Sequence, residues 1–319
     1  MLILGVSIVF IGNSSSHTSN LAYPKSGDIY AAPIYIDDLD PNHNWDTFLS
    51  ERPWISGSGE AGNPYKIHSF RIDAQGGSYC ISVKNSNKFF YIEECTLFNT
   101  GQAEFGTGIC FDNVTWGFIV NSDIYNNGFS GILATNSSFI AFSNTIHGNE
   151  GYGISLGGCQ ATILHRNTIQ YHSGAGIELY KCSGIIVAEN ELSYNGYYGV
   201  ICDYTNESEI LDNSISSHND GVTLAESNNN LIDGNSISHN DESGIMLAYN
   251  SNFNSITNNR LNDNQYCILI GESCQGTQLS NNGDCQVYSF DDSLPSSDDP
   301  GGDDNNDLDD ECRKRNVCK

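Results

Sequence analysis

Positive charge is scarce in this sequence of 319 residues. Lysines and arginines number 13 against 39 aspartates and glutamates, which gives a formal net charge of -26. Phosphate backbones and anionic lipid surfaces are bound by clustered cations, so we exclude nucleic acid as a partner. No apolar stretch reaches the roughly 18 residues that a membrane-spanning helix needs, so the sequence predicts no membrane span.

The two ends of the chain differ in composition from the rest. The apolar run 1–11 is followed by a polar serine-rich stretch, and residues 1–20 are predicted to be a signal peptide, although the usual early positive charge is missing. A buried strand is the alternative. The 11 cysteines suit an oxidising compartment, so we expect a secreted, cell-surface or periplasmic protein. Residues 291–319 are rich in aspartate and predict an acidic disordered tail.

A short phrase recurs through the middle of the chain: Asn-x-Ile, and about nine residues later Gly-Ile or Gly-Val. A period in this range is typical of a solenoid with one structural unit per repeat. The glycines follow one another at intervals of 22 or 23 residues, at Gly108, Gly131, Gly153, Gly176, Gly199, Gly221 and Gly244.

Each repeat divides into three short apolar runs separated by polar corners. Alternating apolar residues at this length predict strands and leave no room for a helix. The sequence therefore predicts an all-β, single-stranded parallel β-helix of about nine coils over residues 80–290. Residues 21–79 are expected to form an N-terminal cap and a first incomplete coil, with one or two helical turns near 44–49 and a lid of Trp45, Phe48 and Trp54.

Two columns of the repeat are interpreted as structure. Asparagine tolerates the left-handed backbone of a sharp corner, and its amide can bond the equivalent amide one coil away. The glycines supply either a positive φ or close packing. The expected asparagine ladder comprises Asn144, Asn167, Asn190, Asn213, Asn235 and Asn259.

A leucine-rich repeat is the alternative solenoid. It shares the period but has leucine at the positions where this chain has Ile, Val and Gly.

Cysteine spacing suggests three disulfides. Cys159 and Cys182 occupy the same place on adjacent coils, within disulfide reach, and are the favoured pair. Cys274 with Cys285, and Cys312 with Cys318, follow in that order. Cys202 is expected to be a free core thiol.

These repeats resemble the right-handed parallel β-helix repeats of NosD-like periplasmic proteins and of carbohydrate-binding and sugar-hydrolysing β-helices. The resemblance covers about 32–290 and is carried by motifs such as Asn213-Ser214-Ile215 followed by Gly221-Val222. It implies a right-handed β-helix. In enzymes of this kind, the reacting carboxylates project from the Gly-Ile-x-Leu sheet and the turn after it.

In this chain, the same part of the repeat contains one candidate patch on its outer face. Glu178 and Asp203 fall on neighbouring coils and are the candidate catalytic acid and base. Tyr180, Lys181 and Tyr204 flank them and would bind a sugar by stacking and hydrogen bonding. The alternative is a solvated outer face with scattered charge.

Other signatures of polyuronate lyases and polygalacturonases are missing: the Asp pair after Asn-Thr, Gly-His-Gly and clustered cations. The acidic surface would also repel polyuronates at low salt. We therefore expect a non-catalytic scaffold that binds a polysaccharide or a surface glycoprotein. A carbohydrate-active hydrolase or lyase that uses Glu178 and Asp203 is the alternative, and a NosD-like metal-related protein is the second.

No cofactor is expected to be required. Copper is not supported, because the sequence has only two methionines and its turn histidines are expected at the surface. These are His147, His172, His218 and His239. Weak calcium binding by the tail is left open, since Asp303, Asn305, Asp307, Asp309 and Glu311 place oxygen ligands at alternate positions.

Overall fold

The structure, a computed structural model, describes residues 29–52, 55–102 and 106–292. The predicted signal peptide, Trp54, the tail beyond residue 292 with its calcium ligands, and the Cys312–Cys318 pair lie outside these residues.

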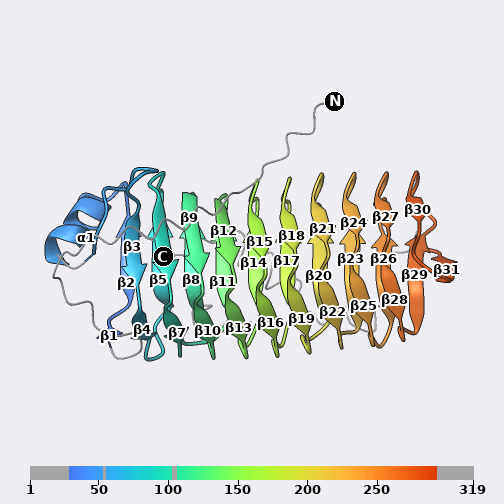
Figure 1. Ribbon diagram of the computed structural model, residues 1–319, viewed down its shortest axis with the longest axis horizontal. Coiled ribbons are helices and arrows are strands. Elements are labelled where there is room, and N and C mark those ends of the chain that lie inside the picture. The colour runs from blue at the N-terminus through green and yellow to red at the C-terminus, as the bar shows by residue number, and fades with distance from the viewer. Residues whose placement is uncertain (1–28, 53–54, 103–105, 293–319) are drawn as a thin grey trace.

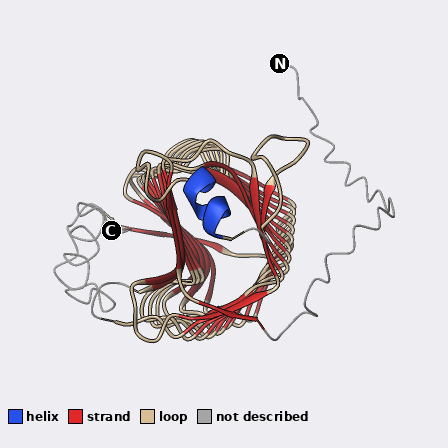
Figure 2. Cartoon of the chain, turned by 90° about the vertical axis from the view of Figure 1, so that its left-hand side faces the viewer, coloured by secondary structure: helices blue, strands red, loops and turns tan. Residues whose placement is uncertain are grey.

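The described chain winds into a solenoid of three parallel sheets (Figure 1). Each coil gives one strand to sheet B, then one to sheet C, then one to sheet A, and neighbours in every sheet are one coil apart. Figure 2 shows the three sheets end-on, enclosing the interior. This is the predicted parallel β-helix, and the leucine-rich repeat alternative is wrong.

The strands are short and recur in the same order in every coil. Sheet B has 11 strands: β2 (Ile34–Asp37), β5 (Tyr79–Lys84), β8 (Thr107–Asp112), β11 (Ile132–Thr135), β14 (Ile154–Gly157), β17 (Ile177–Tyr180), β20 (Tyr198–Asp203), β23 (Asp220–Ala225), β26 (Ser243–Ala248), β29 (Tyr266–Gly271) and β31 (Val287–Phe290). Sheet C has 10: β3 (Tyr65–His68), β6 (Phe90–Glu93), β9 (Thr115–Val120), β12 (Ser138–Phe142), β15 (Ile163–His165), β18 (Ile186–Ala188), β21 (Glu209–Leu211), β24 (Leu231–Asp233), β27 (Ser255–Thr257) and β30 (Gln278–Ser280). Sheet A also has 10: β1 (Ile29–Ala31), β4 (Phe70–Asp73), β7 (Thr96–Phe98), β10 (Asp123–Tyr125), β13 (Thr145–His147), β16 (Thr168–Gln170), β19 (Glu191–Ser193), β22 (Ser214–Ser216), β25 (Ser236–Ser238) and β28 (Arg260–Asn262).

The core is a set of apolar columns in register from coil to coil. In sheet B, Ile132 lies opposite Ile154, and Ile154 opposite Ile177. All three side chains are fully buried. Full burial of one such side chain contributes about 1.5–3 kcal/mol, so the columns supply the main favourable term in every coil.

The glycine column permits close packing of neighbouring coils. None of its members has a positive φ. A Cβ on Gly153 would lie 2.5 Å from the carbonyl oxygen of Gly176 and 2.5 Å from a methyl group of Ile169. Any side chain here would therefore push the next coil away.

One helix, α1 (Trp45–Glu51), lies at the N-terminal end of the solenoid (Figure 1). Asn44 caps it by accepting a hydrogen bond from the Thr47 amide at 2.9 Å. The buried indole of Trp45 stacks on Tyr65 at 4.5 Å. The helix is inserted between β2 and β3, so residues 34–73 already place a strand in each sheet. Among the described residues, no helix is long and apolar enough to cross a membrane.

Candidate functional site

Strand register brings the predicted site residues onto two adjacent strands of sheet B. Tyr180 on β17 lies opposite Asp203 on β20, and Glu178 lies opposite Ile201. Glu178 and Asp203 are therefore diagonal neighbours, offset by two residues along strands about 4.8 Å apart.

Three of the five residues form a compact cluster at the corner that follows these strands. The ammonium of Lys181 lies 4.6 Å from the centroid of the Tyr180 ring and 5.7 Å from that of Tyr204. The two rings meet edge to face at 6.1 Å. Attraction between the cation and the ring faces holds Lys181 in place. We call Tyr180, Lys181, Tyr204 and Glu226 the corner cluster.

Glu226 is a member of the corner cluster that the sequence pattern did not single out. The Tyr204 hydroxyl donates a hydrogen bond to the Glu226 carboxylate at 2.6 Å, and this bond raises the pKa of Tyr204 to about 12. The phenol is therefore a neutral donor at ordinary pH. The available signal was position, since Lys181, Tyr204 and Glu226 each lie five residues after their repeat glycine.

Left-handed backbone at this corner is a property of the fold. Lys181, Tyr204 and Glu226 have φ of 53°, 50° and 46°. Asn113 and Asn136, at the same corner of earlier coils, have φ of 55° and 48°. Because the whole column shares this conformation, it is no evidence of function.

Glu178 points away from the core but is withdrawn from solvent. Its side chain is 6% exposed, and Ser155 on the preceding coil donates a hydrogen bond to it at 2.6 Å. Tyr204, at the corner, is 41% exposed. The patch therefore divides into an accessible corner cluster and a covered carboxylate on the sheet.

The asparagine column forms a continuous buried ladder. Asn190, for example, donates from its side-chain amide to the Asn213 amide oxygen at 3.0 Å and to the Leu164 carbonyl at 2.8 Å. These buried side chains join neighbouring coils by hydrogen bonds, so they are not accessible to a substrate. The predicted bonds between amides are confirmed, but the predicted left-handed backbone was wrong, since the left-handed residue is the one before each asparagine, such as Glu189 before Asn190.

A second buried ladder includes two of the turn histidines. The His172 Nδ1 accepts from the Asn149 amide at 3.2 Å, and the Asn195 side chain contacts the His218 Nε2 at 3.1 Å. Both rings are 3% exposed, and burial lowers each pKa to about 4. The prediction that these two histidines are surface residues was wrong, because they take places that asparagines fill on neighbouring coils.

Two predicted disulfides are not formed. Cys159 and Cys182 are free, buried thiols. Each thiol instead lies against a backbone carbonyl of the preceding coil, Cys159 at 3.4 Å from the Ala134 oxygen and Cys182 at 3.4 Å from the Leu156 oxygen. Cys202 is also a free, fully buried thiol.

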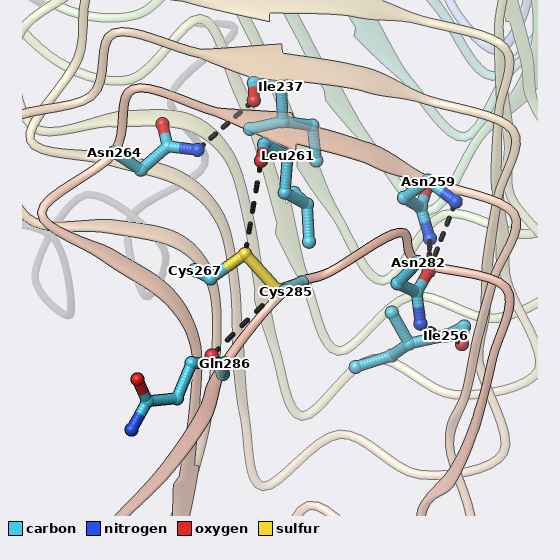
Figure 3. Close-up of a disulfide and its surroundings, with 9 residues drawn as sticks. All are labelled: Ile237, Ile256, Asn259, Leu261, Asn264, Cys267, Asn282, Cys285 and Gln286. Carbon is cyan, nitrogen blue, oxygen red and sulfur yellow. Dashed lines mark hydrogen bonds between the residues drawn. A yellow bond between two sulfur atoms is a disulfide. The ribbon is translucent and has the colours of Figure 1, made fainter.

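The last coil contains a different pair from the one predicted. Cys285 is bonded to Cys267, with Cα atoms 5.7 Å apart (Figure 3). Cys274 is free. Cys267 is the second residue of β29, and Cys285 lies two residues before β31, which pairs with β29 in parallel. Cys274 follows the end of β29, about a strand length away, which explains the correction.

A hollow lies beside α1. It encloses about 580 Å³ and is lined in part by Asp38, Trp45, Tyr65 and Lys88. Burial raises the pKa of Asp38. As for metals, residues 29–292, apart from the short gaps, contain no group of three or more His, Cys, Asp or Glu side chains arranged to hold an ion.

The chain belongs to the family described as "Right handed beta helix region", which it matches over residues 55–206 and 153–293. These segments together span well over half of the sequence. No curated protein matches the chain.

Several solved structures share the fold. The A-module of mannuronan C-5 epimerase AlgE4 from Azotobacter vinelandii is 13% identical, with a TM-score of 0.52 and coverage of 73% of this chain and 85% of that one. The periplasmic alginate epimerase AlgG is 15% identical, with a TM-score of 0.51 and coverage of 82% and 84%. The Dettilon tailspike protein is 12% identical, with a TM-score of 0.57 and coverage of 69% and 56%. At these identities the likeness concerns the fold alone.

Proposed function

We propose that this protein is an exported β-helix that binds a neutral polysaccharide or a surface glycoprotein through the corner cluster, without chemical turnover. The observation that carries this proposal is the arrangement of Tyr180, Lys181 and Tyr204. An exposed phenol ring offers a stacking surface for a sugar, and its hydroxyl and the ammonium offer hydrogen bonds.

The surroundings of Glu178 support binding over catalysis. A general acid or base must come within hydrogen-bond reach of the reacting group. Glu178 is covered and engaged by Ser155, whereas the corner cluster is accessible. The formal charge of -26 favours a neutral glycan over a polyuronate.

Export is supported by three features. They are the apolar segment at residues 1–11, the Cys267–Cys285 disulfide, and structural neighbours that include a periplasmic epimerase. A disulfide of this kind persists in oxidising compartments.

Binding and turnover are separated by one experiment on the purified protein. A panel of neutral and acidic polysaccharides is incubated with it, with and without calcium, and thermal shift and new reducing or unsaturated ends are measured. We expect a thermal shift without new ends. The shift should be lost in Tyr204→Ala and kept in Tyr171→Ala, which removes an exposed tyrosine at another corner.

Turnover that disappears in both Glu178→Gln and Asp203→Asn would overturn the non-catalytic proposal and establish the enzyme alternative. If binding is retained in Tyr204→Ala, the glycan binds at a place other than the corner cluster. Stabilisation by copper alone would favour the metal-related alternative.

A further inference from the structure

The hollow beside α1 has a polar wall that comes from the first three coils. Its volume of about 580 Å³ lies within the range of small-molecule sites. Asp38, Asn85 and Asn113 line it, and each directly follows a sheet B strand, β2, β5 or β8, so they lie one above another. The Asn113 side chain donates to the Asn85 amide oxygen at 3.1 Å, and Asn85 donates to the Asp37 carboxylate at 2.9 Å. These bonds set the orientation of the wall.

Two buried aromatic side chains form another part of the lining. Trp45 is 1% exposed and Tyr65 is 4% exposed, and their rings stack on each other. The indole Nε1 of Trp45 also donates to the Ser86 hydroxyl at 2.9 Å. Because these contacts hold both rings in place, the hollow exists before any ligand enters it.

One carboxylate oxygen of the wall lacks a hydrogen-bond donor. The Oδ2 atom of Asp38 is buried and has no hydrogen-bond partner within the described chain. Ser86, the Trp45 amide and Lys88 favour the charged carboxylate, but burial outweighs them and raises the pKa of Asp38. Buried polar atoms are normally hydrogen-bonded, so the missing donor has to come from a ligand or from water.

A pair of stacked aromatic rings lies next to the hollow in the sequence of each coil. Phe89 and Trp116 directly follow Lys88 and Thr115, two residues of the lining. Their ring centroids are 5.0 Å apart with an interplanar angle of 14°, and Trp116 is 55% exposed. We call this pair the platform. An exposed indole presents a flat apolar surface that suits the C–H face of a sugar ring.

Trp116 is exposed because β9 contains a β-bulge. Ser138 and Phe139 are neighbours on β12, but they pair with Thr115 and Gly117 of β9, and Trp116 is left as the extra residue. Thr115 and Trp116 are therefore both exposed, where strict alternation would expose one of them. Bulges are frequent next to functional sites, where they redirect a side chain.

We propose that the hollow and the platform together bind a neutral glycan, with a terminal sugar in the hollow and the next sugar on the ring of Trp116. Sugar hydroxyls would donate to Asp38 and exchange hydrogen bonds with Asn113. The charged groups of the lining are Asp38, Asp46 and Lys88. Two carboxylates against one ammonium give a negative field, which disfavours an acidic sugar.

This site is separate from the corner cluster. Both follow strands of sheet B, but three strand-to-strand steps lead from β8 to β17, or about 14 Å. Binding in the hollow does not rest on the corner cluster, and the two proposals can fail separately. The experiment is therefore done in a chain that carries Tyr204→Ala, which disables the corner cluster.

Titration calorimetry on this chain tests the site. The probes are neutral pentasaccharides of glucose, mannose and xylose, with a galacturonate pentamer and spermidine as charged comparisons. We expect a neutral probe to bind and the charged ones not to bind. Trp116→Ala should weaken binding about tenfold, and Trp116→Phe, which keeps a stacking ring, should weaken it no more than about threefold. Asp38→Asn should weaken binding about tenfold, because the amide replaces an acceptor by a donor.

Phe253→Ala is the matched control, because it removes a ring that is 66% exposed and lies two residues before the sheet C strand β27. It should bind like its parent. The thermal midpoint of each variant shows that it is folded.

Three results would overturn the proposal. They are the absence of binding by every neutral pentasaccharide, binding that is equal in the parent and in Trp116→Ala, and a loss in Phe253→Ala as large as that in Trp116→Ala. Binding of spermidine without any sugar would show a cation site in the hollow, and the proposal would again be wrong.

Discussion

The buried histidines of the second ladder should make this protein lose stability in mild acid. Nδ1 of His172 accepts from the Asn149 amide, while its Nε2 lies 3.1 Å from the Ile146 carbonyl. Only the neutral ring satisfies both partners. Protonation would turn Nδ1 into a donor that faces another donor, in a place that is 3% exposed.

The pKa values of the two histidines give the sign and the size of the change in unfolding free energy with pH. Burial lowers the pKa of His172 and of His218 from an ordinary 6.5 to about 4. Between these values the unfolded chain binds protons that the folded chain does not, so stability falls as the pH drops. At pH 5.0 the loss should be about 2 kcal/mol per histidine, rising to roughly 3 kcal/mol at pH 4.

The perturbation is the double substitution His172→Asn and His218→Asn. Asparagine already fills this place on neighbouring coils, at Asn149, Asn195 and Asn240, and offers both an acceptor and a donor. At pH 7.5 the variant should lose no more than about 2 kcal/mol, from the volume of the rings. Between pH 7.5 and pH 5.0 it should lose about 4 kcal/mol less than the parent protein.

Urea unfolding at the two pH values measures the difference, and carboxylates common to both chains cancel. The same substitution at the exposed His239 is the control, since that ring lies outside the buried ladder. An equal loss in the parent and the double variant would refute the reasoning, since the buried rings would then titrate as they do in water.

Two further predictions concern stability. Asn190→Ala deprives the Asn167 amide and the Leu164 carbonyl of partners, and each orphaned group costs about 1–3 kcal/mol. Urea unfolding should therefore show a loss of about 2–6 kcal/mol, against less than about 0.5 kcal/mol for the exposed Asn262→Ala; similar losses in the two would contradict the ladder. Cys267→Ser opens a loop of 18 residues and should cost about 3 kcal/mol, measured as a lower thermal midpoint that reduction of the parent reproduces; a midpoint unchanged by both would show that the bond adds nothing.

Much of the fold could be predicted because the same residue pattern recurs on every coil. The interval of 22 or 23 residues, the alternating Ile and Val columns and the asparagine at one corner each recur, so a chance match on one coil does not mislead. The glycine column left two explanations open, and contact distances at Gly153 decided for close packing.

The site was predicted only in part. Strand alternation placed Glu178, Tyr180 and Asp203 on the outer face correctly, because side-chain direction in a strand follows from position alone. The hydrogen bond from Ser155 to Glu178 and the bond from Tyr204 to Glu226 depend on what neighbouring coils contribute, and no local pattern encodes that.

The sequence by itself determined the period, the parallel β-helix and the membership of the Ile and Val columns, because these depend on hydrophobic alternation within one repeat. Tertiary structure alone decided that His172 and His218 lie inside and that Cys267 pairs with Cys285. The reason is physical. Burial and disulfide pairing depend on distances between residues far apart in the chain, and these exist only once the coils have stacked.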